Sequence, residues 1–186
     1  MLYMGRLCMK ENRAFQFIGE MPMFDKLLNE VLSLTDEDWT EYEGRKKRRG
    51  AASAITDTIP LFYDVRQRID SAILHKNCER FSAYVDEVVL AASEHLGELK
   101  LQQSMLTRLH AGVVIPEHRD EGRVTKVTHR IHVAIITNPE CIFTIGGESK
   151  NLEPGQMWII DNVGRLHSVR NDGTEHRAHL IVDVSQ

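Results

Sequence analysis

The sequence predicts a mainly β protein with N-terminal helices. In the first half, apolar residues recur at helical spacing, whereas after residue 98 short apolar or alternating runs are separated by turn residues. The chain has 186 residues, of which 42% are hydrophobic, and a formal net charge of −4, so it can form one sizeable core. We expect one domain over 1–186, built from a helical support region at 1–98 and a β core at 99–186.

Two amphipathic helices are predicted in the support region. One lies between Phe24 and Leu32 and the other within 78–96, because both stretches carry apolar residues three or four positions apart. Gly97 is a suitable stop for the second helix. The segment 53–64 favours extended structure instead, since it is rich in β-branched residues and its proline suits an edge strand.

Seven strands are predicted in the β core. Turn-forming pairs such as Asn138-Pro139 and Gly146-Gly147 separate them. The strands lie at 99–109, 112–115, 129–137, 141–146, 157–160, 166–170 and 176–184.

The composition argues against a secreted, membrane or zinc-finger protein. Cys8, Cys78 and Cys141 are far apart and odd in number, so no CxxC pair is available for zinc or redox chemistry. The N-terminal stretch lacks the apolar core of a signal peptide, and no later stretch approaches the roughly 18 apolar residues of a membrane span. We expect a cytoplasmic protein that does not insert into membranes, while its oligomeric state is not indicated.

The run RKKRR at 45–49 is the densest basic stretch, and glycines flank it. Such a run can bind nucleic acid or another polyanion. A solvated loop is the favoured interpretation, because the rest of the chain is slightly acidic and the run has few aromatic neighbours.

Two predicted strands carry arginine and histidine on one face. Side chains alternate between the faces of a sheet, so Arg130 shares a face with His132, and Arg177 shares a face with His179. The intervening positions of both strands are mainly aliphatic. Either a polar-lined cavity inside a small barrel or a solvent-exposed face would produce this pattern.

An ordered set of four residues predicts a metal site. His118 and Asp120 form an HxD pair in PEHRDEG, and His167 follows in GRLHSVRN. Two histidines and one carboxylate form the facial set that binds non-haem Fe(II), leaving three positions for a bidentate 2-oxo acid and O2. Arg177 follows His167 by about one strand and one turn, so its guanidinium can pair with the distal carboxylate of such a co-substrate. Without that order, turn residues and a surface ion pair would explain the same four residues.

Six stretches of the second half resemble the aspartyl/asparaginyl β-hydroxylase family of Fe(II)- and 2-oxoglutarate-dependent dioxygenases. They are PEHRDEG, HRIHVAIITNP, FTIGGE, LEPGQMWIIDN, HSVRNDG and RAHLIVDV. The resemblance covers 100–186, and the first half matches only in its helical character. It implies that the core is a double-stranded β-helix, which is a jelly-roll or cupin-like fold.

The resemblance also implies roles for individual residues. His118 and His167 would be iron ligands, and Arg177 would hold the distal carboxylate of 2-oxoglutarate. Arg130 and His132, in the R-x-H strand of the family, would help to seat the co-substrate or the substrate.

Two further positions are singled out by the resemblance. Thr107 lies where a hydroxyl residue often assists the co-substrate carboxylate. The family's animal aspartyl hydroxylases lack the carboxylate ligand, whereas Asp120 would complete a metal triad here, as in the proline-hydroxylating bacterial members. This departure affects the expected substrate more than the expected chemistry.

We therefore expect an Fe(II)- and 2-oxoglutarate-dependent dioxygenase that uses O2 to hydroxylate an amino-acid side chain, either Asp or Asn in a polypeptide or a free amino acid such as proline. Arg130, His132 and the basic run would suit acidic substrates. An oxidative nucleic-acid demethylase is less favoured, because such enzymes usually carry a second arginine six residues after the first, where this chain has Asp183. A non-catalytic cupin-like sensor of a small ligand is a third hypothesis, but it has no special need for Arg177.

Overall fold

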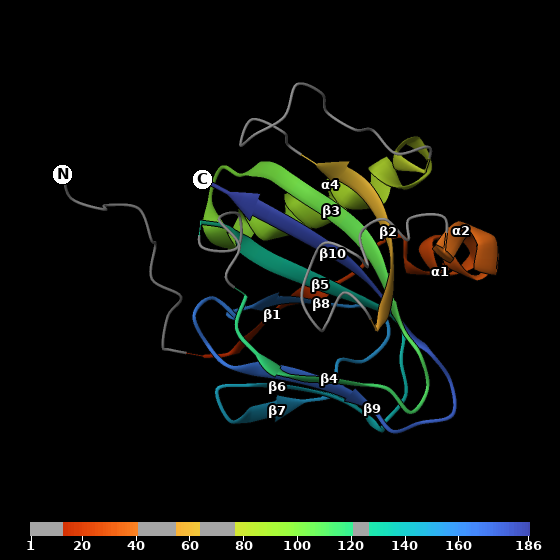
Figure 1. Ribbon diagram of the computed structural model, residues 1–186. Helices are drawn as coiled ribbons and strands as arrows, with labels where there is room; N and C mark the ends of the chain where they lie inside the picture. Colours follow the sequence, from red (N-terminus) through yellow and green to blue (C-terminus); the bar gives the residue numbers. More distant parts are fainter. Residues whose placement is uncertain (1–12, 41–54, 64–76, 121–126) are drawn as a thin grey trace.

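Figure 1 shows the computed structural model of the protein, which describes residues 13–40, 55–63, 77–120 and 127–186. In these ranges two antiparallel sheets face each other. The large sheet contains, in spatial order, β1 (Phe15–Glu20), β8 (Gln156–Ile160), β5 (His129–Ile136), β10 (Arg177–Ser185), β3 (Lys100–Leu109) and β2 (Thr56–Tyr63). The small sheet contains β4 (Val114–His118), β9 (His167–Asn171), β6 (Cys141–Ile145) and β7 (Glu148–Lys150). The helices are α1 (Phe24–Leu32), α2 (Asp36–Thr40) and α4 (Cys78–Leu96).

The large sheet is apolar on the face that packs against the helices. In Figure 1, α4 lies behind this sheet and the small sheet lies below it. Alternate residues of β5 and β10 join the buried helix residues in one cluster, which includes Leu27, Phe81, Val88, Ile131, Val133, Ile135, Leu180, Val182 and Val184. Burying these aliphatic side chains is the main force that attaches the helices to the sheet.

The opposite face of the large sheet meets the small sheet. A second buried cluster joins Ala134 and Ile160 of the large sheet to Ile115, Phe143 and Val169 of the small one. His132, Arg177 and His179 occupy this inner face and are buried. The alternation that the sequence predicted is therefore confirmed, and its polar side faces the interior between the sheets rather than solvent.

The structure confirms the two predicted helices and all seven strands of the second half within a few residues. Gly97 ends α4 with φ of 85°, in the left-handed region that glycine tolerates, and its N–H donates to the Ser93 carbonyl. The segment 53–64 supplies β2, an edge strand that contains Pro60.

The first half also contributes β1, which was not expected beside the helices and the extended segment 53–64. β1 and β2 form the two edges of the large sheet. The sequence reading also missed α2 and β7, which have five and three residues and are too short to show a periodicity.

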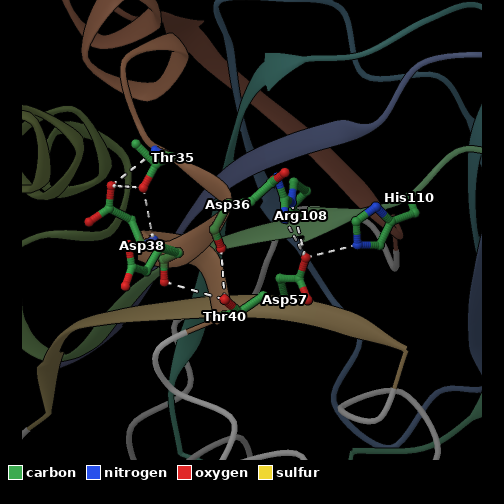
Figure 2. Close-up of polar contacts among 8 residues, drawn as sticks. Thr35, Asp36, Asp38, Thr40, Asp57, Arg108 and His110 are labelled. Atoms are coloured by element: carbon green, nitrogen blue, oxygen red, sulfur yellow. Dashed lines mark hydrogen bonds and ion pairs between the residues drawn. The ribbon is translucent and has the colours of Figure 1, made fainter.

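A polar cluster attaches α2 to the strands β2 and β3 (Figure 2). Arg108 donates from Nε and Nη2 to Asp57 Oδ2, at 3.0 and 2.8 Å, and from Nη1 to Asp36 of α2, at 2.7 Å. His110 Nε2 also lies 2.8 Å from Asp57 Oδ2. The Arg108 guanidinium lies over the Trp39 ring, 5.0 Å from its centroid, so the charge is paired on one side and stacked on the other.

The start of α2 is closed by a reciprocal cap, which Figure 2 also shows. The Thr35 backbone N–H donates to Asp38 Oδ2 at 2.9 Å, and the Asp38 N–H donates to Thr35 Oγ1 at 3.2 Å. These bonds satisfy N–H groups that the first turn leaves without helical partners.

Some sequence expectations fall outside the described ranges. The basic run 45–49 and Cys8 lie outside them, and the described thiols Cys78 and Cys141 are free. Among the helices that the structure describes, none combines the length and apolar character required to cross a membrane.

Candidate metal centre

Three predicted ligands meet at the edge of the small sheet. His118 ends β4 and His167 begins β9, and the two residues are directly paired between these strands. Asp120 follows β4 and forms an isolated bridge with Val163. The candidate ligand atoms of the three side chains all lie within 4.8 Å of one another.

The distances suit a shared metal ion. Asp120 Oδ1 lies 3.7 Å from His118 Nε2 and 3.8 Å from His167 Nε2. Two donor atoms that bind one metal at bond lengths of about 2.1 Å are at most about 4.2 Å apart. Asp120 can therefore share a metal with either histidine.

Backbone contacts set the tautomer of both histidines. His118 Nδ1 lies 2.8 Å from the Pro116 carbonyl, and His167 Nδ1 lies 3.1 Å from the Arg165 carbonyl. A carbonyl can only accept, so Nδ1 donates in each ring and Nε2 carries the lone pair. Burial lowers the pKa of His167, partly offset by its bond to Arg165 and by Asp120, which favours the neutral ring that a metal requires.

Asp120 is held by one of its two oxygens. Asp120 Oδ2 accepts from Arg130 Nη1 and from Asn162 Nδ2, each at 2.9 Å. The other oxygen, Oδ1, is the one directed toward the histidine nitrogens. The carboxylate is thus oriented for binding through a single oxygen.

Arg130 is in turn held by a buried carboxylate. Its Nε donates to Asp183 Oδ1 at 2.8 Å and its Nη2 to Asp183 Oδ2 at 2.9 Å, while Gln103 Nε2 also donates to Asp183. Burial alone would lower the pKa of Arg130, but Asp183 and Asp120 raise it above its ordinary value, so the guanidinium is firmly charged. Arg130 was expected to seat the co-substrate or substrate, yet each of its three nitrogen atoms binds a carboxylate of this chain.

The surroundings of Arg177 differ from those of Arg130, which binds two carboxylates. Its side chain is buried, and its Nη2 donates to His179 Nδ1 at 2.6 Å. Among the residues that the structure describes, no carboxylate pairs with it. Burial lowers the pKa of Arg177 to about 10, and only Cys141 partly offsets this effect. A buried cation without a carboxylate is costly, which favours an anion as its binding partner.

Arg177 and the metal ligands are connected through side chains between the sheets. The His167 ring is stacked with Phe143, with centroids 6.4 Å apart, and Phe143 contacts His132 edge-on at 5.6 Å. His132 Nδ1 lies 3.2 Å from His179 Nδ1, the atom that accepts from Arg177. Burial and nearby Arg177 lower the pKa of both His132 and His179 well below the ordinary range, so both rings are neutral.

Three buried polar atoms on this inner face have no partner in the described part of the chain. They are Thr107 Oγ1, His132 Nε2 and Gln103 Oε1. The single lone pair of His179 Nδ1 accepts from Arg177, so the 3.2 Å approach of His132 Nδ1 does not fix the tautomer of His132. Thr107 is directly opposite His179 in the sheet, on the face that carries Arg177. Unsatisfied buried atoms beside an unpaired cation are the surroundings that a polar anionic ligand would complete.

The structure brings His118, Asp120 and His167 together and puts Arg130 beside them. His132, Thr107 and Arg177 lie on the same inner face. Sequence reasoning gave no role to Gln103 or Asp183, and it placed His179 on the face of Arg177 without assigning it a role. Strand parity places Asp183 on the face of Arg177, and this was the available signal for its role.

Comparison with known proteins agrees with this geometry. A model of the aspartyl/asparaginyl β-hydroxylase family matches residues 23–186. A search of curated proteins finds no significant match.

Several solved structures share the fold. A 2OG-Fe(II) oxygenase family oxidoreductase from Burkholderia pseudomallei is 12% identical with a TM-score of 0.58, covering 90% of each chain. A prolyl-4-hydroxylase from Pseudomonas putida is 13% identical with a TM-score of 0.55, covering 94% of each chain. A viral collagen prolyl hydroxylase from Paramecium Bursaria Chlorella virus-1, in a 2OG complex, is 6% identical with a TM-score of 0.56, covering 95% of this chain and 98% of that one. At these identities the likeness establishes the fold alone.

Proposed function

Because the chain belongs to the aspartyl/asparaginyl β-hydroxylase family, we propose that it is an Fe(II)- and 2-oxoglutarate-dependent dioxygenase that hydroxylates an amino-acid side chain. The observation that carries this proposal is the pairing of two features between the sheets. One is a His-Asp-His set whose Nε2 atoms carry the lone pairs, and the other is a buried arginine that pairs with no carboxylate of the described residues.

The residues present fit both groups. His118, His167 and Asp120 offer two imidazole nitrogens and one carboxylate oxygen, which is the set that non-haem Fe(II) takes with positions left open. Arg177 offers a fork of donors for the distal carboxylate of 2-oxoglutarate, and the unpartnered Thr107 hydroxyl can donate to the same carboxylate.

When bound, Fe(II) with 2-oxoglutarate and O2 supplies the oxidant for an unactivated C–H bond, and 2-oxoglutarate is converted to succinate and CO2. The contribution of this chain is to bind, orient and shield. The Pro116 and Arg165 carbonyls keep the Nε2 atoms of the two histidines unprotonated. His132 Nε2, which has no partner among the described residues, would be available for a hydrogen bond with a polar group of a bound molecule.

We also propose that the two sheets form a double-stranded β-helix within a single domain. From β3 onward the strands alternate between the sheets, except that the short β7 follows β6 in the same sheet: β3, β5, β8 and β10 belong to the large sheet, while β4, β6, β7 and β9 belong to the small one. The solved structures with this fold support the assignment.

For the substrate, we propose an amino-acid side chain, in a polypeptide or a free amino acid such as proline. The family name supports Asp or Asn, whereas two structural neighbours act on prolyl residues. Asp120 supports proline or a prolyl residue as the substrate. It would supply the carboxylate ligand that the resemblance assigns to proline-hydroxylating members.

The test is to incubate the iron-loaded protein and 2-oxoglutarate with separate pools of free amino acids, cell-extract peptides and methylated oligonucleotides. We expect stimulated succinate release, and addition of one oxygen atom to a component of the first or second pool. Stimulation by methylated oligonucleotides alone, with formaldehyde released, would replace this proposal by a demethylase. Absence of succinate with every pool would favour the sensor hypothesis.

A further inference from the structure

Three donor groups of Arg130 connect two acidic residues of this chain. Nη1 binds Asp120, whereas Nε and Nη2 bind Asp183, all at 2.8–2.9 Å. Asp183 is fully buried, and Gln103 donates to it from the neighbouring strand β3. Both oxygens of Asp183 are used by a rigid planar guanidinium, so the direction of Nη1 is fixed by the sheet.

The fixed Nη1 determines which oxygen of Asp120 is free. Arg130 and Asn162 both donate to Oδ2, and Oδ1 faces His118 and His167. A carboxylate with one oxygen bound by two donors has its other oxygen available, so it binds a metal through one atom and leaves more coordination positions open.

We propose that Arg130 is a positioning residue for the metal carboxylate, held in place by Asp183 and assisted by Asn162, rather than a residue that binds the co-substrate or substrate. This inference rests on the proposed function, since it requires a metal at His118, Asp120 and His167. It assigns a role to Asp183, whose position and burial are otherwise unexplained.

The alternative role for Arg130 is less consistent with its contacts. To bind a substrate carboxylate, the guanidinium would have to release Asp120 or Asp183. Releasing Asp183 would leave a fully buried carboxylate without its cation, which is strongly unfavourable. Releasing Asp120 would remove one of the two donors that orient it.

The test measures metal affinity, with Co(II) as the probe, in full-length variants under anaerobic conditions. Arg130→Lys keeps the charge, but an ammonium cannot bind both Asp183 oxygens and Asp120 in the same fork geometry. We expect Arg130→Lys to weaken Co(II) binding about 10- to 100-fold, the usual effect of losing a partner of a metal ligand. The visible absorption of bound Co(II) should also change, because the carboxylate orientation changes.

A double-mutant cycle separates positioning from a general effect on folding. In an Asp120→Ala background the carboxylate is gone, so Arg130→Lys should have little further effect on Co(II) affinity. Asn162→Ala removes the other donor without changing any charge, and its effect should likewise depend on Asp120. Arg170→Lys is the matched control, because Arg170 is exposed and pairs with exposed Asp172. The Co(II) affinity of this variant should equal that of the parent.

The outcomes are distinct. Parent-like Co(II) affinity in both Arg130→Lys and Asn162→Ala would overturn the inference, and weaker 2-oxoglutarate binding in Arg130→Lys would then return that residue to co-substrate binding. An equal loss with and without Asp120 would reduce Arg130 to a structural role. If Arg130→Lys does not fold, Asn162→Ala decides. Failure of the parent itself to bind Co(II) would instead refute the proposed function.

Discussion

Replacing Arg177 by methionine should make the ligand-free protein more stable. The substitution keeps an unbranched apolar side chain and removes a buried charge. The guanidinium is charged at neutral pH in both the folded and the unfolded protein, and burial lowers its pKa from the ordinary value to about 10 on folding. Folding therefore carries a cost of about 3 kcal/mol at every pH below the folded pKa, because each pKa unit is worth about 1.4 kcal/mol.

Removing the charge should stabilise the folded protein by this amount, but the substitution also removes the hydrogen bond to His179. Removing the Nη2 donor deprives His179 Nδ1 of a partner, at a cost of about 1 kcal/mol. The net stabilisation is then about 2 kcal/mol, or about 4–8 °C in the unfolding midpoint for a chain of this size. Thermal unfolding of the ligand-free parent and of Arg177→Met measures the difference, with the exposed Arg170→Met as control.

The same substitution should weaken 2-oxoglutarate binding. Loss of one partner of a buried charged pair costs about 2–5 kcal/mol, which corresponds to a dissociation constant about 30- to several thousand-fold higher. Calorimetric titration of the Mn(II)-loaded proteins tests this. A less stable ligand-free variant would refute the argument that the charge is unpaired, and an unchanged 2-oxoglutarate affinity would place the anchor elsewhere.

Three further predictions concern metal binding and stability. His118→Ala or His167→Ala should abolish Fe(II) binding and 2-oxoglutarate decarboxylation, because one imidazole is then missing; undiminished iron affinity in both would remove the oxygenase assignment. Asp120→Gly should weaken metal binding and suppress turnover, and near-full activity would show that the site works with two histidines. Asp57→Ala should lower the free energy of unfolding by about 3 kcal/mol, because exposed Asp36 is then the one carboxylate among the described residues that pairs with the largely buried Arg108 guanidinium; an unchanged denaturation midpoint would contradict this.

The elements of the fold that could be predicted are those with a regular spacing of apolar residues within a short stretch of sequence. The period-2 alternation of 129–137 and 176–184 gave both the strands and their polar faces, and 3.6-residue spacing gave α1 and α4. β1 was not predicted, because its pairing with β8 across more than 130 residues of sequence is not visible in the six residues FQFIGE.

The candidate ligands were predictable for the same reason, and their supporting residues were not. HxD, a distal histidine and an arginine form an ordered motif whose chemistry can be read from residue type and spacing. Arg130 was singled out by the R-x-H strand of the resemblance, but its contacts with Asp183 and Asp120 depend on strand register and side-chain geometry. An arginine that binds a ligand and one that orients a carboxylate look identical in sequence, so the contacts of Arg130 with two carboxylates could not be foreseen from the residue type.

The charges between the sheets also bear on the substrate. Arg130 was expected to attract acidic substrates, but its charge is balanced by Asp120 and Asp183. Arg177 is the inward-facing buried cation that lacks a carboxylate among the described residues, and 2-oxoglutarate is proposed to use it. An acidic side chain of the substrate would then need a cation from another part of the chain, such as the basic run 45–49. A prolyl residue within a polypeptide has no negative charge and no such requirement, so the contacts of Arg130 favour the prolyl class over Asp.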